Sequence, residues 1–216
     1  MKKLLILTLV ASATLFSCSK SSNTKPQSAN TVTINGTAYN TVTIGTQTWT
    51  TVNYNGTGGV NYNNSTTNNP TYGKLYTIAE AEAITVPTGW RLPTETDVAT
   101  LLTYLGATGN INTGIDGSSP VSIKLKSKAD WTFTQGNNSS GFNAYPAGEL
   151  NNGSFDFING QAVFWTSTAD TYSDQYTLNI TNLQDGPNVD DDASLDFVSN
   201  SNVSTFGASI RFVKNN

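Results

Sequence analysis

The sequence predicts an α+β domain in which two short helices pack on mixed or antiparallel β-sheets joined by long loops. Valine and isoleucine alternate with threonine over residues 31–52, and short alternating segments return after about Pro120. Two helical patterns lie between these regions, within residues 77–106. A period of two is typical of half-buried strands and a period near 3.6 of helices, so strands flank a pair of neighbouring helices.

Residues 1–17 have the three parts of a secretory signal. Lys2 and Lys3 precede a mostly apolar segment, Leu4–Leu15. That segment is too short for a membrane span, which needs about 20 apolar residues. The following Leu15-Phe16-Ser17-Cys18 matches a lipobox, so we expect cleavage before Cys18 and attachment of lipid to its thiol.

An ordinary secretory cleavage site, Ala11-Ser12-Ala13, offers an alternative. It would leave Cys18 as an unpaired thiol in a secreted protein. Under the lipoprotein reading, Cys18 is the membrane attachment and residues 18–30, which are small and polar, form a flexible tether. The residue after the cysteine, Ser19, is not an acidic residue of the kind that retains lipoproteins in the inner membrane, so we expect attachment to the outer membrane. The sequence leaves open whether the domain faces the periplasm or the outside of the cell.

The composition limits the chemistry of the domain, residues 31–216. Cys18 is the only cysteine and there is no histidine, so no internal disulfide, cysteine nucleophile or histidine base is expected. The net charge of the full chain is −4, and the sequence has no cluster of lysine and arginine, which argues against nucleic acid as a partner. We expect no cofactor.

The first elements carry local turn and cap signals. Asn35-Gly36 between alternating runs predicts a hairpin, because both residues of such a turn take positive φ. A third strand is expected over Gln47–Val52, and residues 53–71 are expected to form a surface loop. Thr77 to Glu80 opens a short helix that ends before Pro87.

The second helix is the best specified. Thr94 and Asp97 form a capping pattern, Val98, Leu101, Leu102 and Leu105 form one apolar stripe, and Gly106 is placed to end the helix. From about Pro120 onward we expect strands only.

Seven phrases in order resemble the Fibrobacter succinogenes major paralogous domain (FISUMP), which is common in envelope lipoproteins. They are Val42 to Trp49, Tyr72 to Tyr76, Pro87 to Pro93, Lys124 to Ser127, Ser140 to Gly148, Phe164 to Thr168 and Ser209 to Lys214. The resemblance implies a C-type-lectin-like fold, shared with the formylglycine-generating sulfatase-modifying family.

The sequence departs from the family at two positions. Relatives usually carry a cysteine where Val86 and Phe212 stand here. The resemblance implies that these two cysteines form a disulfide in relatives. Their joint absence here suggests that the two positions are neighbours in space.

An acidic stretch, residues 185–196, raises the question of a calcium site. Asp190, Asp192 and Asp196 carry oxygen ligands that suit calcium, but Leu195 stands where an EF-hand loop needs glycine. Alternation of Ala193, Leu195 and Phe197 with polar residues favours a half-buried strand instead. The metal-binding role of these residues stays unknown.

Two further sets of residues are candidates for function. Glu149 and Asp170 would serve glycoside chemistry if they faced one another across a cleft. Among the aromatic residues, Trp131, Tyr54 and Tyr62 are the better candidates for stacking on a ligand at the surface, whereas Trp90 and Trp165 belong to phrases that look structural.

These observations favour a membrane-anchored envelope lipoprotein with a non-catalytic domain that binds a glycan or protein, or is structural. The alternative is a carboxylate-based enzyme related to the formylglycine-generating fold group. Without histidine or a free cysteine, such an enzyme would depend on carboxylates, tyrosine, lysine and hydroxyls.

Overall fold

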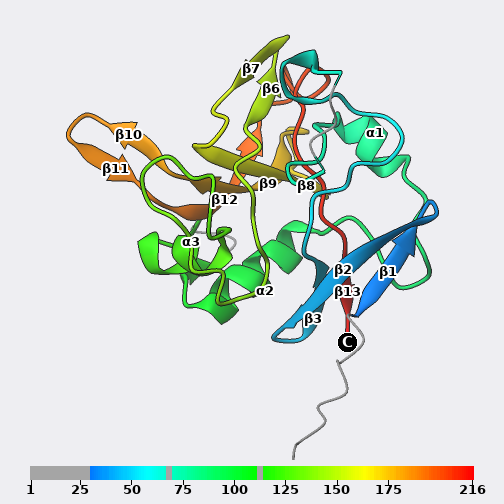
Figure 1. The fold of residues 1–216 in the computed structure, drawn as a ribbon, viewed down its shortest axis with the longest axis horizontal. Coiled ribbons are helices and arrows are strands. Elements are labelled where there is room, and N and C mark those ends of the chain that lie inside the picture. The colour runs from blue at the N-terminus through cyan, green and yellow to red at the C-terminus, as the bar shows by residue number, and fades with distance from the viewer. Residues whose placement is uncertain (1–29, 67–69, 111–113) are drawn as a thin grey trace, which may run out of the picture.

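A computed structural model describes residues 30–66, 70–110 and 114–216 (Figure 1). The expected signal peptide, Cys18 and residues 18–29 of the expected tether lie outside these ranges. Within them, no helix has both the length and the apolar character needed to cross a membrane.

The strands of the described residues form two larger sheets and two hairpins. The four-stranded sheet has the order β1 (Thr31–Ile34), β2 (Thr37–Ile44), β3 (Gln47–Thr50) and β13 (Val213–Asn215). The five-stranded sheet has the order β4 (Thr108–Asn110), β5 (Gly114–Asp116), β12 (Ala193–Val198), β9 (Gln175–Thr181) and β8 (Gln161–Ala169). The hairpins are β6 (Glu149–Asn151) with β7 (Ser154–Asp156), and β10 (Leu183–Asp185) with β11 (Asn188–Asp190).

The predicted hairpin at Asn35-Gly36 is confirmed. Asn35 has a φ of 48° and Gly36 a φ of 81°, and Ile34 pairs with Thr37 across the turn. Asparagine and glycine tolerate this left-handed backbone better than other residues, which is why the pair specifies the turn.

Both predicted helices are present, as α1 (Ile78–Glu82) and α2 (Glu95–Leu105). Each begins with a complete capping box, Thr77 with Glu80 and Thr94 with Asp97. Gly106 ends α2 with a φ of 106°, where its backbone N–H reaches the last carbonyls of the helix. A 3₁₀ turn, η1 (Tyr62–Asn64), interrupts the long loop before α1.

The prediction that only strands follow Pro120 is wrong, because α3 (Ser119–Leu125) is a helix. Pro120 lies in its first turn, where a missing N–H has no cost, and Val121 and Leu125 bury one face. One turn of apolar residues is too short to distinguish a helix from a strand by periodicity.

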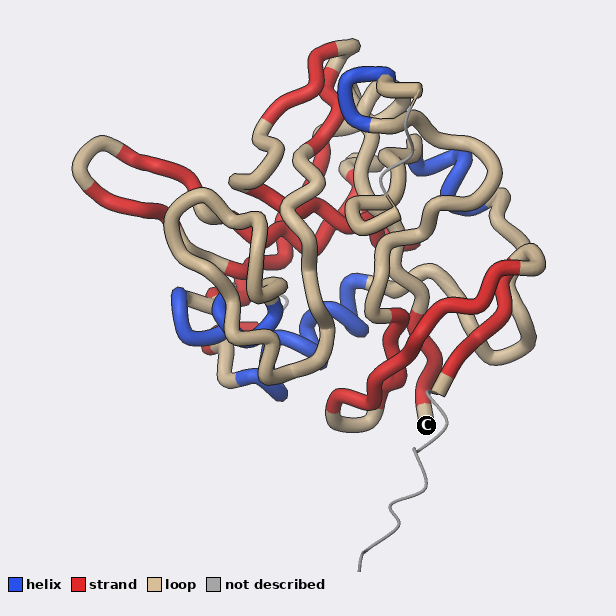
Figure 2. The backbone as a smooth tube through the Cα atoms, viewed as in Figure 1, coloured by secondary structure: helices blue, strands red, loops and turns tan. Residues whose placement is uncertain are grey.

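The five-stranded sheet separates two hydrophobic clusters, and α2 and α3 lie beside one of its faces (Figure 1). The face toward these helices carries Ala162, Phe164, Leu178, Ile180 and Ala193, which join residues of α2 and α3 in the first cluster. The opposite face carries Val163, Trp165 and Val198, which belong to the second cluster. Long loops around α1 and η1, tan in Figure 2, cover this second side.

Phe212 is a buried member of the second cluster, and Val86 is partly buried and packs against the same cluster. Apolar packing is therefore found at both positions where the family resemblance implied a cysteine.

Candidate functional site

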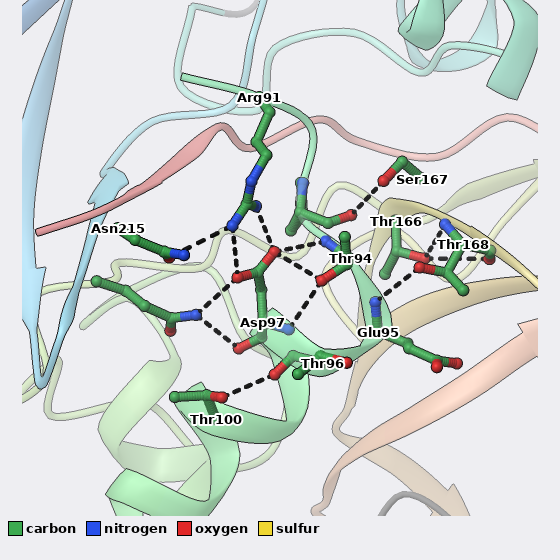
Figure 3. Close-up of polar contacts among 12 residues, drawn as sticks. Arg91, Thr94, Glu95, Thr96, Asp97, Thr100, Thr166, Ser167, Thr168 and Asn215 are labelled. Atoms are coloured by element: carbon green, nitrogen blue, oxygen red, sulfur yellow. Dashed lines mark hydrogen bonds and ion pairs between the residues drawn. The ribbon is translucent and has the colours of Figure 1, made fainter. Parts of the chain in front are cut away.

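A densely hydrogen-bonded polar cluster surrounds Asp97 (Figure 3). Arg91 donates hydrogen bonds to both oxygens of the Asp97 carboxylate, one of them with Nη2 and Oδ1 3.0 Å apart. The backbone N–H of Thr94 donates to Oδ2 at 2.7 Å, and Gln47 donates to Oδ1 at 3.0 Å. These contacts join the start of α2 to β3, so the cluster has a structural role.

The environment of Asp97 changes its ionisation. Burial by itself would raise the pKa of Asp97, but hydrogen bonds from Arg91 and from the backbone and hydroxyl of Thr94 hold that pKa below its ordinary value. Each oxygen of this carboxylate therefore serves the helix cap or the ion pair rather than a ligand.

A polar pocket of about 200 Å³ lies on the second face of the five-stranded sheet. Strands β6, β8, β9 and β12 and the segment 199–206 surround it. Its polar lining comes from acids, amides and hydroxyls: Glu149, Asp196, Asn151, Asn179, Asn202, Gln161, Thr177 and Ser199. We call this the Glu149 pocket.

Glu149 is fixed in place by the backbone on either side. The N–H of Gly148 donates to the carbonyl of Gln161 at 2.9 Å, and the N–H of Leu150 donates to that of Gly207 at 3.0 Å. Gly148 has a φ of 68°, and a Cβ there would come within 2.3 Å of the carbonyl oxygen of Asp156. Only glycine allows β6 to approach this closely.

Glu149 is a buried carboxylate, with only 8% of the residue exposed. Burial raises its pKa, and the nearby charges of Asp156 and Asp196 raise it further, while a hydrogen bond with the Asn151 side chain lowers it. No lysine or arginine is among the residues that line the pocket. The pocket therefore lacks a positive charge of its own to offset Glu149.

Gln161, which lines the same pocket, has a buried side-chain oxygen without a partner among the described residues. Its Nε2 donates to Oδ1 of Asn179 at 2.9 Å, which fixes the orientation of the amide. Its Oε1 is buried and has no hydrogen-bond partner among the described residues. A buried acceptor without a partner costs about 1–3 kcal/mol, so a donor on a ligand would relieve this cost.

Asp196 lies at the outer side of the pocket on β12, whereas the side chain of the next residue, Phe197, points to the opposite face of the sheet. Thr177 pairs with Asp196 and Tyr176 with Phe197 in the register of β9 and β12. The strand is confirmed, with Ala193 buried and Leu195 packed against the first cluster on one face, but Phe197 on that same face is 57% exposed rather than buried. β5 pairs with β12 at Ser194, and the described part of β5 does not extend along Asp196 and Phe197, so these two residues lie toward the edge of the sheet.

The expected surface position of two aromatic residues is also wrong. Trp131 is 2% exposed, and its Nε1 donates to Oγ of Ser127 at 3.1 Å. Tyr54 is 1% exposed, with its ring centre 5.6 Å from that of Phe212. Both rings are enclosed by segments distant in sequence, so neither presents a stacking surface.

Tyr62 is half-buried, with its ring centre 5.3 Å from that of Phe155. Burial raises its pKa, a hydrogen bond at the Ile158 backbone lowers it, and the charge of Asp156 raises it. Its ring therefore packs against the β6–β7 hairpin rather than standing free at the surface.

The expected pair of Glu149 and Asp170 is not brought together. Asp170 follows the far end of β8 and accepts hydrogen bonds from the N–H groups of Tyr172, at 2.8 Å, and Asp174, at 2.9 Å. It stabilises the β8–β9 turn, whereas Glu149 lies beside the start of β8. The carboxylate that shares a pocket with Glu149 is Asp196.

The acidic stretch separates into residues with different surroundings. Asp190 ends β11, Asp192 precedes β12, and Asp196 lines the Glu149 pocket. Within residues 30–66, 70–110 and 114–216, no three acidic, histidine or cysteine side chains gather as a metal site would require. Asp191, which the sequence did not single out, forms a buried ion pair with Lys126 at 2.7 Å.

The pocket combines hydrogen-bonding groups with the apolar side chains of Val163, Val198 and Phe206. Its volume is below the about 300–1,000 Å³ that drug-sized ligands occupy, so it suits one small unit of a larger molecule. The carboxylates, amides and hydroxyls of this lining can bind a hydroxylated or amine-bearing group, and its apolar side chains can contact the apolar face of the same group.

The model of the Fibrobacter succinogenes major domain matches residues 42–214. No curated protein and no solved structure matches the chain.

Proposed function

The chain belongs to the Fibrobacter succinogenes major domain family, and from this premise we propose that it is a lipid-anchored envelope protein whose domain binds a glycan, without catalysis, in the Glu149 pocket. The observation that carries the binding proposal is the pocket itself, whose lining includes the buried carboxylate of Glu149 and the amide of Gln161, together with the apolar side chains of Val163, Val198 and Phe206. The Oε1 atom of Gln161 has no hydrogen-bond partner among the described residues. Sugars offer hydroxyl donors and an apolar ring face, which match these groups.

The proposed anchor is lipid on Cys18, and the proposed membrane is the outer membrane. Support comes from the lipobox, the polar residues 18–30 and Ser19 after the cysteine. Two or more acyl chains give stable attachment, so the acidic domain needs no electrostatic attraction to lipid. Mass spectrometry of the mature N-terminus tests this: acylated Cys18 is expected, and an N-terminus at Thr14 with a free thiol would contradict it.

The arrangement of the domain suits display on such an anchor. β6, which carries Glu149 and Asn151, lies at the top of Figure 1, whereas β1 and the C-terminus lie at the lower right. A chain tethered before β1 would therefore present the β6–β7 end away from the membrane.

We also propose that the fold is C-type-lectin-like. The seven phrases in order, the helices between two strand-rich regions and the pairing of β13 with β3 support this assignment. A solved structure superimposed on C-type-lectin-like domains would test it.

A glycan array tests the binding proposal. The tested form starts at Ser19, because every described helix and strand and both hydrophobic clusters lie after Asn30. Selective signals are expected, with loss in Glu149→Ala and retention in Glu82→Ala, an exposed acid on α1. Binding that survives Glu149→Ala would place the site elsewhere, and a blank array with a protein captured in a pull-down would favour a protein ligand.

A carboxylate-based enzyme is the second candidate, favoured by one observation. Glu149, with a raised pKa, and Asp196 share a pocket, and glycosidases use one protonated and one ionised carboxyl group. Release of reducing sugar from glycans that the domain binds, lost in both Glu149→Gln and Asp196→Asn, would establish this candidate over pure binding.

A further inference from the structure

We propose that the ligand of the Glu149 pocket carries a protonated primary amine, as an amino sugar with a free amino group does, and that Glu149 and Asp196 bind this ammonium group. The inference rests on the proposed function and deepens it, because it names the charged group of the ligand that the same pocket takes.

The charges around the pocket favour a cation. Its two ionisable lining residues, Glu149 and Asp196, are both acids, and Asp156 adds a third negative charge near Glu149. A neutral saccharide would leave this negative potential without compensation. An ammonium group would offset it and form charge-assisted hydrogen bonds, which are roughly twice as strong as neutral ones.

The hydrogen-bonding capacity of the pocket fits the same group. An ammonium has three donors and no acceptor. Glu149 and Asp196 supply carboxylate acceptors to the lining, and Gln161 lines the same pocket. The Oε1 atom of Gln161 is buried and has no partner among the described residues, and the residue as a whole is 7% exposed, so this amide is not a solvated surface group.

A divalent metal fits this lining less well. Calcium takes six to eight oxygen ligands, commonly with several carboxylates. Only two acids line the pocket, and the described part of the chain holds no group of three acids at metal-binding spacing. The apolar part of the lining, Val163, Val198 and Phe206, also favours an organic ligand with an apolar face over a bare ion.

Binding of an ammonium is expected to depend on pH. Burial and the charges of Asp156 and Asp196 raise the pKa of Glu149, and the Asn151 side chain, the other polar group recorded as bonding to it, lowers it. A bound cation stabilises the ionised carboxylate and releases a proton. Affinity should therefore increase as pH rises through the pKa of Glu149.

The test is an NMR titration of the protein from Ser19 onward with three probes at matched ionic strength: glucosamine, N-acetylglucosamine and glucose. Acetylation removes the positive charge of glucosamine but keeps its ring. We expect glucosamine to bind about tenfold or more tightly than either neutral sugar, the difference that about 1.4 kcal/mol gives. Glu149→Gln and Asp196→Asn should each remove this preference.

Glu82→Gln is the matched control, because it removes one exposed negative charge on α1, outside the residues that line the pocket. It should retain the preference for glucosamine. Thermal unfolding of each variant separates loss of binding from loss of fold.

Each other outcome overturns the inference in a distinguishable way. Equal binding of the three sugars, with loss in Glu149→Ala, overturns the amine and leaves the proposed glycan site intact. A response to calcium chloride that displaces glucosamine overturns the amine in favour of a metal. Binding by none of the probes at millimolar concentration overturns the amine, while the glycan array independently decides the proposed function.

Discussion

The guanidinium of Arg211 donates a hydrogen bond of 2.7 Å to the main-chain oxygen of Phe142 and lies 4.9 Å from the centre of the same residue's ring. Its other donors reach the carbonyls of Thr50 and Asn143 and Oδ1 of Asn53, at 2.8–2.9 Å. Burial lowers the pKa of Arg211 to about 9, which leaves it protonated at neutral pH. A fully buried cation is thus held by neutral oxygens and aromatic faces instead of an acid.

Replacement of Arg211 by methionine should destabilise the domain by about 3 kcal/mol or more. Methionine fills much of the volume, but four buried oxygens lose a donor, and each loss costs about 1–3 kcal/mol before relaxation. Chemical denaturation measures the free energy of unfolding. Lys128→Met, at an exposed position, is the control and should change stability by less than about 0.5 kcal/mol. A similarly small effect of Arg211→Met would show that the bonds described here contribute little.

The ionisation of Asp97 should make the stability of the domain decrease at low pH. Its folded pKa lies below its ordinary value of 3.8 because hydrogen bonds from Arg91 and Thr94 outweigh burial. The stability that this lowered pKa contributes is therefore complete above about pH 4 and is lost as pH falls through the folded pKa. Unfolding curves of the protein should decline steeply below pH 4, whereas those of Asp97→Asn should start lower and decline less. Parallel curves would contradict the assigned ionisation.

Removal of only one partner of the buried ion pair between Lys126 and Asp191 should strongly destabilise the domain. Nζ and Oδ1 are 2.7 Å apart, and Ser122 also donates to this oxygen. Lys126→Met leaves a buried carboxylate without its cation and should cost about 3–5 kcal/mol. The double variant Lys126→Met/Asp191→Leu should cost less than the two single changes added together. Additive losses in this cycle would mean that the two charges are not coupled.

Glu149→Gln should raise stability and lower binding at the same time. The folded pKa of Glu149 is raised above its ordinary value of 4.5, so its ionised form reduces stability as pH rises through that folded pKa. Removal of the charge should add about 0.5–2 kcal/mol at neutral pH, with the gain disappearing below about pH 4, where the carboxyl group is protonated in both states. Denaturation at several pH values measures this; a loss of stability at neutral pH would contradict it.

Local signals in the sequence predicted the elements that depend on neighbouring residues. Asn35-Gly36 specifies its turn through backbone freedom, and Thr94, Asp97 and Gly106 mark both ends of α2. In each case the partners lie within a few residues, so a sequence window contains the whole interaction.

The parts that the sequence did not predict depend on contacts between distant segments. Trp131 has the polar neighbours of a surface residue, yet α3 and the loop that carries Ala144 enclose its ring, whose N–H also reaches the Ala144 carbonyl at 3.3 Å. Glu149 was identified as a candidate, but its neighbour in the pocket, Asp196, follows from the β9–β12 register. The hydrophobic periodicity of a sequence does not show which distant segments pair with one another.

Mapping of backbone amide shifts on binding of a saccharide identified by the array tests the central claim most directly. If the Glu149 pocket is the binding site, the largest changes will occur at Asn151, Gln161 and Asn179, with small changes at Thr100 and Tyr104 on the outer face of α2. Shifts confined to α2, with β6 and β8 unchanged, would contradict the assignment of the site.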